Sequence, residues 1–159
     1  MSAASTKIGI AIYAQQGPYG RPRNPHWSLV LHPTSFSAKD VRVYHLRNRG
    51  NTWFLGHEVR DLPRMGDLIG VLHVADIPGS AFNDAKENPQ KAFGIDQLDL
   101  FIWSCESYVI RALAYLGEAG AFKLPCNPDG MYEYTKKRIA ALKALPSSAD
   151  EITIISYTE

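Results

Sequence analysis

The chain contains few cysteines, no long hydrophobic run and no excess of charge of either sign. Its 159 residues include two cysteines, 17 Lys and Arg, and 16 Asp and Glu, which gives a formal net charge of +1. A near-neutral chain has no general electrostatic attraction to nucleic acid, so we expect no nucleic-acid partner. No segment approaches the roughly 20 apolar residues of a membrane-spanning helix. We therefore expect no stable membrane anchor.

A secretory signal is also missing. Residues Met1–Thr6 are small and polar, and we expect them to be flexible. The sequence therefore favours a cytoplasmic, reducing location in which Cys105 and Cys126 are free thiols. No Cys-x-x-Cys or His-x-x-x-His spacing occurs, so we predict no metal site and no cofactor.

The length and the 45% hydrophobic content fit one domain over residues 1–159. The first half of the chain is predicted to form β-strands, because it has runs of β-branched and aromatic residues between turn-rich segments. The predicted strands are Lys7–Ala14, His26–His32, Val41–Asn48, Thr52–Val59 and Asp67–Ala75, with a last strand over Glu151–Thr158. Gly50 and Asn51 suit a tight hairpin, and we expect the strands of the first half to be antiparallel.

The second half has helical periodicity. One buried face is predicted from the spacing of six residues, namely Cys105, Tyr108, Val109, Ala112, Leu113 and Leu116. Ser104 is the expected N-cap, and Glu106 complements the helix dipole. A second helix is predicted over Met131–Leu145, and short helical turns are expected on either side of Asn88. Strands followed by helices and a closing strand indicate an α+β fold.

Cys105 is a candidate nucleophile because it lies in the first turn of a helix. Unpaired backbone N–H groups and the helix dipole there favour a thiolate, and we expect a lowered thiol pKa. The same N–H groups are able to stabilise an oxyanion. The alternative is that Cys105, as part of the buried stripe, is only a small core residue.

Five histidines are candidates for the base that such a cysteine needs. His26 opens a strand after a turn-rich loop, and His45 shares a face with buried positions by alternation. The other three are His32, His57 and His73. Spacing alone does not choose among them.

Three motifs resemble those of the circularly permuted papain-like families. These are His26-Trp27 before an apolar strand, Tyr44-His45-Leu46, and Ser104-Cys105-Glu106-Ser107-Tyr108-Val109 at a helix start. They are similar to motifs of the lecithin retinol acyltransferase-like proteins. The wider layout, over roughly residues 7–125, also resembles an uncharacterised group of small fungal proteins.

The resemblance implies a papain-like (permuted) antiparallel sheet packed against the Cys-bearing helix. It implies that Cys105 is the nucleophile, His26 the general base and His45 the residue that orients it. Gln15, Tyr19, Trp27 and Ser104 are then candidates for oxyanion stabilisation or substrate contact. The expected activity is that of a hydrolase or acyltransferase. It would act on an amide, ester or thioester of a small-molecule or peptide substrate, through an acyl-enzyme intermediate.

The chain departs from the acyltransferase pattern at two positions. Ser104 and Ser107 stand where those relatives have Asn and His. Two alternatives follow: a catalytically silent domain of the same fold that binds a partner, or an unrelated small domain. In an unrelated domain, the helix bearing Cys105 would not face the strand bearing His26. The oligomeric state is left open.

Overall fold

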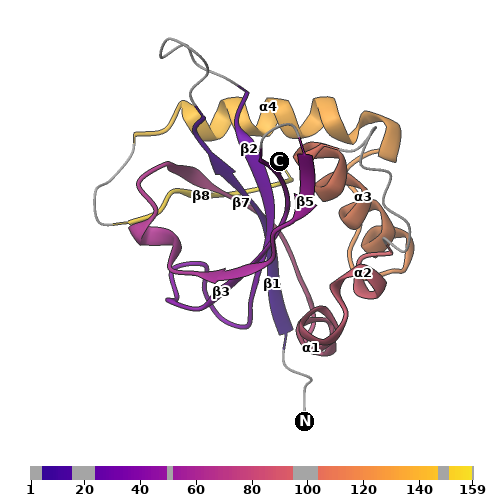
Figure 1. Cartoon of the computed structure of the whole chain (residues 1–159). Helices are drawn as coiled ribbons and strands as arrows, with labels where there is room; N and C mark the ends of the chain where they lie inside the picture. The colour runs from indigo at the N-terminus through magenta and orange to yellow at the C-terminus, as the bar shows by residue number, and fades with distance from the viewer. Residues whose placement is uncertain (1–4, 16–23, 50–51, 95–103, 147–150, 159) are drawn as a thin grey trace.

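A computed structural model describes residues 5–15, 24–49, 52–94, 104–146 and 151–158, with backbone alone at 47–49 and 52–54. The chain is α+β, as predicted (Figure 1). The strands are β1 (Ser5–Tyr13), β2 (His26–His32), β3 (Val41–Tyr44), β4 (Leu46–Arg49), β5 (Thr52–Leu55), β6 (Glu58–Arg60), β7 (Leu68–Pro78) and β8 (Ile154–Ser156). The helices are α1 (Ser80–Glu87), α2 (Pro89–Ala92), α3 (Cys105–Glu118) and α4 (Met131–Lys143).

Six strands form the main sheet, in the order β6-β3-β2-β1-β7-β8. The pairs among β6, β3, β2, β1 and β7 are antiparallel, but β8 runs parallel to β7. The sheet is therefore mixed, and the prediction of an antiparallel sheet is wrong for its last strand. A parallel partner is reached here because α3 and α4 cross one face of the sheet before the chain returns (Figure 1).

Two of the predicted strands are bent rather than continuous. The run Val41–Asn48 is interrupted at His45, and Thr52–Val59 is interrupted at Gly56 and His57. β3 pairs with β6 in the main sheet while β4 pairs with β5 outside it, and the Gly56 N–H donates to the His45 carbonyl at 3.0 Å. The four strands thus form one long hairpin that turns a corner at His45. The expected turn at Gly50 and Asn51 lies outside the described residues.

The helices cover one face of the sheet. Figure 1 shows α1, α2 and α3 along one side and α4 across the end of the strands. All six positions of the predicted α3 stripe are buried: Cys105, Tyr108, Val109, Ala112, Leu113 and Leu116. They pack against β2 side chains such as Leu29 and Leu31. A second cluster, including Tyr13, Val30 and Val43, fills the opposite face.

Several boundaries differ from the predicted ones. β1 begins at Ser5, and Thr6 is 1% exposed, so the expected flexibility does not extend to these two residues. α4 ends at Lys143, two residues before the predicted end at Leu145. In the described part of the chain, no helix has the length and apolar character that a bilayer crossing requires.

Candidate functional site

Cys105 is the first residue of α3, as the sequence predicts. Ser104 caps the helix: its side-chain oxygen accepts a hydrogen bond from the Ser107 N–H at 3.2 Å. The thiol is hydrogen-bonded by the backbone of Trp27 in β2 and donates to Oε1 of Glu106 at 3.7 Å. Cys105 is only 4% exposed. The nucleophile candidate is therefore held between the helix start and the main chain of β2.

The thiol does not have the lowered pKa that its place on the helix predicts. Burial, together with the negative charge of Glu106, raises the pKa of Cys105 to about 11, even though backbone hydrogen bonds from Trp27 and Glu106 act to lower it. Desolvation disfavours the thiolate more strongly than the helix start favours it. Cys105 is accordingly a neutral thiol in this structure.

His26 and His45 form a hydrogen-bonded pair. Nε2 of His26 lies 2.8 Å from Nδ1 of His45. Behind them, Nε2 of His45 lies 3.6 Å from Oε1 of Glu58, whose other oxygen accepts from Arg60 at 2.9 Å. His45 is 5% exposed. The corner of the bent hairpin creates this arrangement, because it places His45 beside the first residue of β2 and Glu58 on the returning strand.

The thiol and the imidazole pair lie at the same end of β2. The Cys105 sulfur contacts the backbone of Trp27, and His26 is the preceding residue. The ring of His26 lies against that of Tyr13, with centroids 5.7 Å apart, whereas Trp27 points to the helices and stacks on Tyr132 of α4. α3 packs on β2, so the helix bearing Cys105 faces the strand bearing His26, but the His26 ring itself lies against Tyr13, which belongs to the cluster on the opposite face of the sheet. The prediction made for an unrelated domain does not hold.

The remaining predicted site residues have different surroundings. Trp27 is 2% exposed and forms a wall between β2 and α4. The side-chain amide of Gln15 donates to the Asn24 carbonyl at 3.0 Å, and so ties together the two ends of the loop that follows β1. Ser104 is the helix cap. Tyr19 lies outside the described residues.

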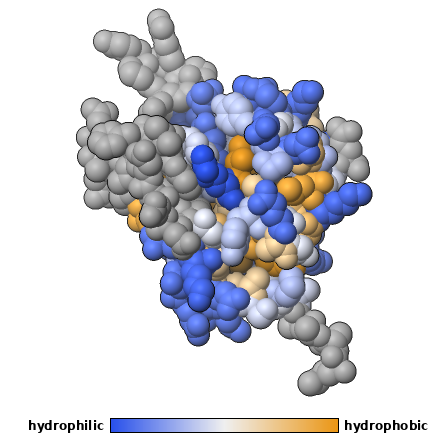
Figure 2. Space-filling model, turned by 90° about the vertical axis from the view of Figure 1, so that its right-hand side faces the viewer, coloured by the Kyte–Doolittle hydropathy of each residue, from blue (hydrophilic) through white to orange (hydrophobic). Residues whose placement is uncertain are grey.

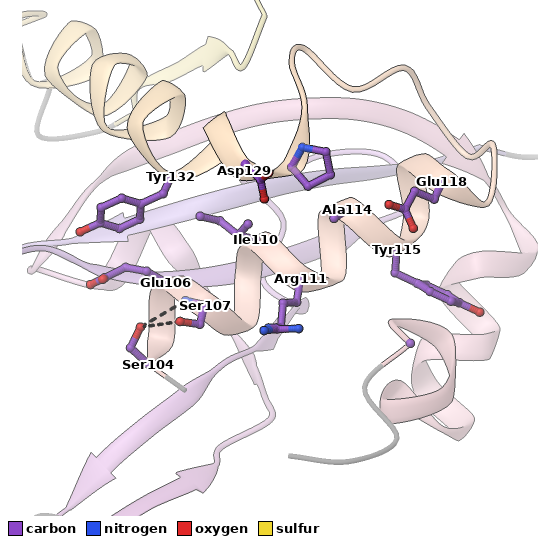
Figure 3. Close-up of a pocket in the computed structure, with 12 residues that line it drawn as sticks. Ser104, Glu106, Ser107, Ile110, Arg111, Ala114, Tyr115, Glu118, Asp129 and Tyr132 are labelled. Carbon is purple, nitrogen blue, oxygen red and sulfur yellow. Dashed lines mark hydrogen bonds between the residues drawn. The ribbon is translucent and has the colours of Figure 1, made fainter. Parts of the chain in front are cut away.

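A groove of about 890 Å³ runs along α3 from its first turn to its last (Figure 3). Ser104, Glu106 and Ser107 line it beside the thiol, and Tyr115 and Glu118 line its far end. A smaller cavity of about 230 Å³ adjoins it, lined in part by Trp27, Lys136 and Ile139. The volume of the groove lies within the range of small-molecule sites, about 300–1,000 Å³, whereas that of the smaller cavity lies below it. Figure 2, which faces the helices, shows apolar surface bordered by hydrophilic side chains on this side.

Sequence reasoning passed over two carboxylates of this site. Glu58 is remote from Cys105 in the chain, and only its pairing opposite Val43 brings it to His45. The sequence indicates Glu106 only as a partner of the helix dipole, although its position next to Cys105 is the signal for its contact with the thiol. His32 and His73 belong elsewhere, since they bind Asp40 and Asp76 at 2.9 and 3.0 Å.

Comparison with known proteins returns no match: no family model, no curated protein and no solved structure is significantly similar to the chain. Cys105 and Cys126 are both free thiols. Within the described ranges, no group of three or more His, Cys, Asp or Glu side chains is arranged to hold a metal ion.

Proposed function

We propose that this protein is a cysteine-dependent hydrolase or acyltransferase with a permuted papain-like arrangement. It would act on an amide, ester or thioester through an acyl-enzyme at Cys105, in a reducing compartment such as the cytoplasm. The observation that carries the proposal is the 2.8 Å hydrogen bond between His26 and His45, at the end of the strand on which the Cys105 thiol rests.

The relay of side chains supports a definite tautomer for each imidazole. The Glu58 carboxylate, 3.6 Å from Nε2 of His45, favours a proton on that nitrogen. Nδ1 of His45 is then an acceptor, and His26 donates to it from Nε2. Nδ1 of His26 therefore carries a lone pair, and in the proposed reaction this atom would accept the thiol proton. His45 and Glu58 are positioning residues in this scheme.

The raised pKa of Cys105 favours general-base catalysis over a preformed thiolate–imidazolium pair. As the sulfur attacks the carbonyl carbon, its proton passes to His26, and first-turn N–H groups of α3 stabilise the oxyanion. The bond to the leaving group then breaks, and His26 returns the proton to that group. Water or an amine, deprotonated by His26, attacks the thioester and restores the thiol.

The test is labelling by a neutral acyl thioester, followed by mass spectrometry of the peptide that contains Cys105. His26→Gln should slow acylation about 100-fold or more, since a general base contributes 10²–10⁴-fold. His45→Gln should slow it less and should shift the pH profile, because it changes the base indirectly. His73→Gln is the matched control, since His73 pairs with Asp76 away from the thiol. Equal rates in wild type and His26→Gln would refute the proposal.

A second candidate is a catalytically silent domain that binds a ligand in the α3 groove. The 4% exposure of Cys105 and its raised pKa favour this alternative. It predicts that Cys105 reacts no faster than the half-buried Cys126 and that the His26 substitution changes nothing. The same labelling experiment therefore separates the two functions.

A further inference from the structure

Glu106 stands between the thiol and the groove. Its Oε1 accepts the S–H of Cys105 at 3.7 Å, and Glu106 also lines both cavities, whereas Cys105 itself lines neither. Tyr132 is the other residue shared by the two cavities. A substrate carbonyl that approaches the sulfur from the groove must therefore pass beside the Glu106 carboxylate.

Of the residues that the structure describes, three carboxylates and one basic residue line the groove, whereas Lys136 and Lys143 line the smaller cavity that Glu106 also borders. Along α3, a row at four-residue spacing consists of Glu106, Ile110, Ala114 and Glu118, and Asp129 lies opposite (Figure 3). Arg111 is the one basic residue among the described residues that line the groove, and it projects from the other side of α3 (Figure 3). The groove is thus apolar in the middle and acidic at its ends.

We propose that the substrate of this site carries an ammonium or guanidinium group next to the reacting carbonyl, and that Glu106 is the residue that selects it. The inference rests on the proposed function and specifies its substrate class. A cation in the groove forms an ion pair with Glu106, whose carboxylate is partly shielded from water, and an anion is repelled there.

The same contact couples substrate binding to activation of the thiol. In the absence of a cation, the Glu106 carboxylate accepts the S–H and its charge opposes thiolate formation. An ion pair with the substrate draws the carboxylate away from the sulfur and offsets its charge. The thiol proton is then available to His26. A cationic substrate therefore both binds in the groove and lowers the free-energy barrier for attack by the thiol on its carbonyl.

Three small methanethiosulfonates test the inference: aminoethyl (cationic), sulfonatoethyl (anionic) and methyl (neutral). Each reacts with a thiolate, which forms a disulfide and expels methanesulfinate while the thiol proton goes to base. Rates are measured on the full chain with Cys126→Ala and divided by those of a free thiol compound. We expect the cationic reagent to exceed the anionic one by at least about fivefold, equivalent to about 1 kcal/mol, and the ratio to fall as salt is added.

Glu106→Gln should bring this ratio close to 1 and should speed modification by the neutral reagent. Glu118→Gln is the matched control, because it removes the same charge from the same helix about 18 Å away, beyond the screening length of about 8 Å. It should leave the ratio nearly unchanged.

Four results would count against the inference. A ratio near 1 in the wild type, or a ratio that Glu106→Gln does not change, overturns the selection by Glu106 while His26-dependent acylation still stands. A ratio that Glu118→Gln lowers as much as Glu106→Gln does shows diffuse groove electrostatics and also overturns it. Cys105 that reacts with none of the reagents removes both the inference and the proposed function.

Discussion

Lowering the pH from 7 to 5 should destabilise the fold through His57. Its ring packs against those of Tyr44 and Tyr108, with centroids 5.0 and 6.1 Å away. Both ring nitrogens are buried, and neither has a hydrogen-bond partner within the described part of the chain. Burial, assisted by the positive charge of Arg42, lowers the pKa of His57 from 6.5 to about 4. Folding therefore requires the neutral imidazole.

The direction and magnitude of this change in stability follow from proton linkage. Above pH 6.5 the histidine is neutral in both states and has no effect. As the pH falls below 6.5, the unfolded chain binds a proton that the folded chain binds only near pH 4, so stability is lost at up to about 1.4 kcal/mol per pH unit. Between pH 6.5 and pH 5 the ceiling is about 2 kcal/mol. Because the ring as a whole is only half-buried, we expect about 1 kcal/mol.

Urea unfolding at pH 7 and pH 5 measures this loss, with circular dichroism as the readout. His57→Phe keeps an aromatic ring between the two tyrosines and removes the titration, so it should lose less stability than the wild type over this range. His73→Gln is the control, because His73 is half-buried and paired with Asp76. If His57→Phe loses as much stability as the wild type, the account of His57 as a buried neutral imidazole is wrong.

Two further predictions concern the elements that hold the site. In Gly70→Ala the new Cβ would lie 2.6 Å from the Thr153 carbonyl oxygen. We therefore expect the free energy of unfolding in urea to fall by about 1–3 kcal/mol. Gly66→Ala is the control and should be nearly neutral, because a Cβ at Gly66 would meet nothing within 4 Å. Ser104→Ala removes the acceptor of the Ser107 N–H and should lower the free energy of unfolding by about 1 kcal/mol. Ser104→Asp keeps a good N-cap and should not lower it. Equal losses in the two variants would show that Ser104 does not stabilise the fold as a helix cap.

The parts of the site that depend on local sequence could be predicted. The α3 stripe repeats every three to four residues within one helix, and all of its predicted positions are buried. The Ser104 cap depends on Ser107, three residues later. These patterns need no knowledge of the rest of the chain, because the interacting groups lie within one or two helical turns.

The parts of the site that depend on pairing between distant segments could not be predicted from the sequence. Nothing in the run from Val41 to Asn48 breaks β-alternation, so the corner at His45 is invisible until β5 and β6 are placed beside it. The approach of Glu58 to His45 depends on that corner. The α3 stripe predicts that Cys105 is buried, but the direction of its pKa shift is predicted wrongly, because the desolvation that the fold imposes on the thiol outweighs the effect of the helix start.

The parallel pairing of β8 with β7 has a consequence for assembly. Val71 meets Ile154 across this pair, and Tyr157, just after β8, is fully buried. A contact between positions so far apart in the chain carries a large loop-closure cost, so it belongs among the late steps of folding. Until it forms, the open side of β7 is an unprotected template for strands of other molecules. Substitutions that loosen β8 should therefore appear first as aggregation, before any change in the chemistry at Cys105.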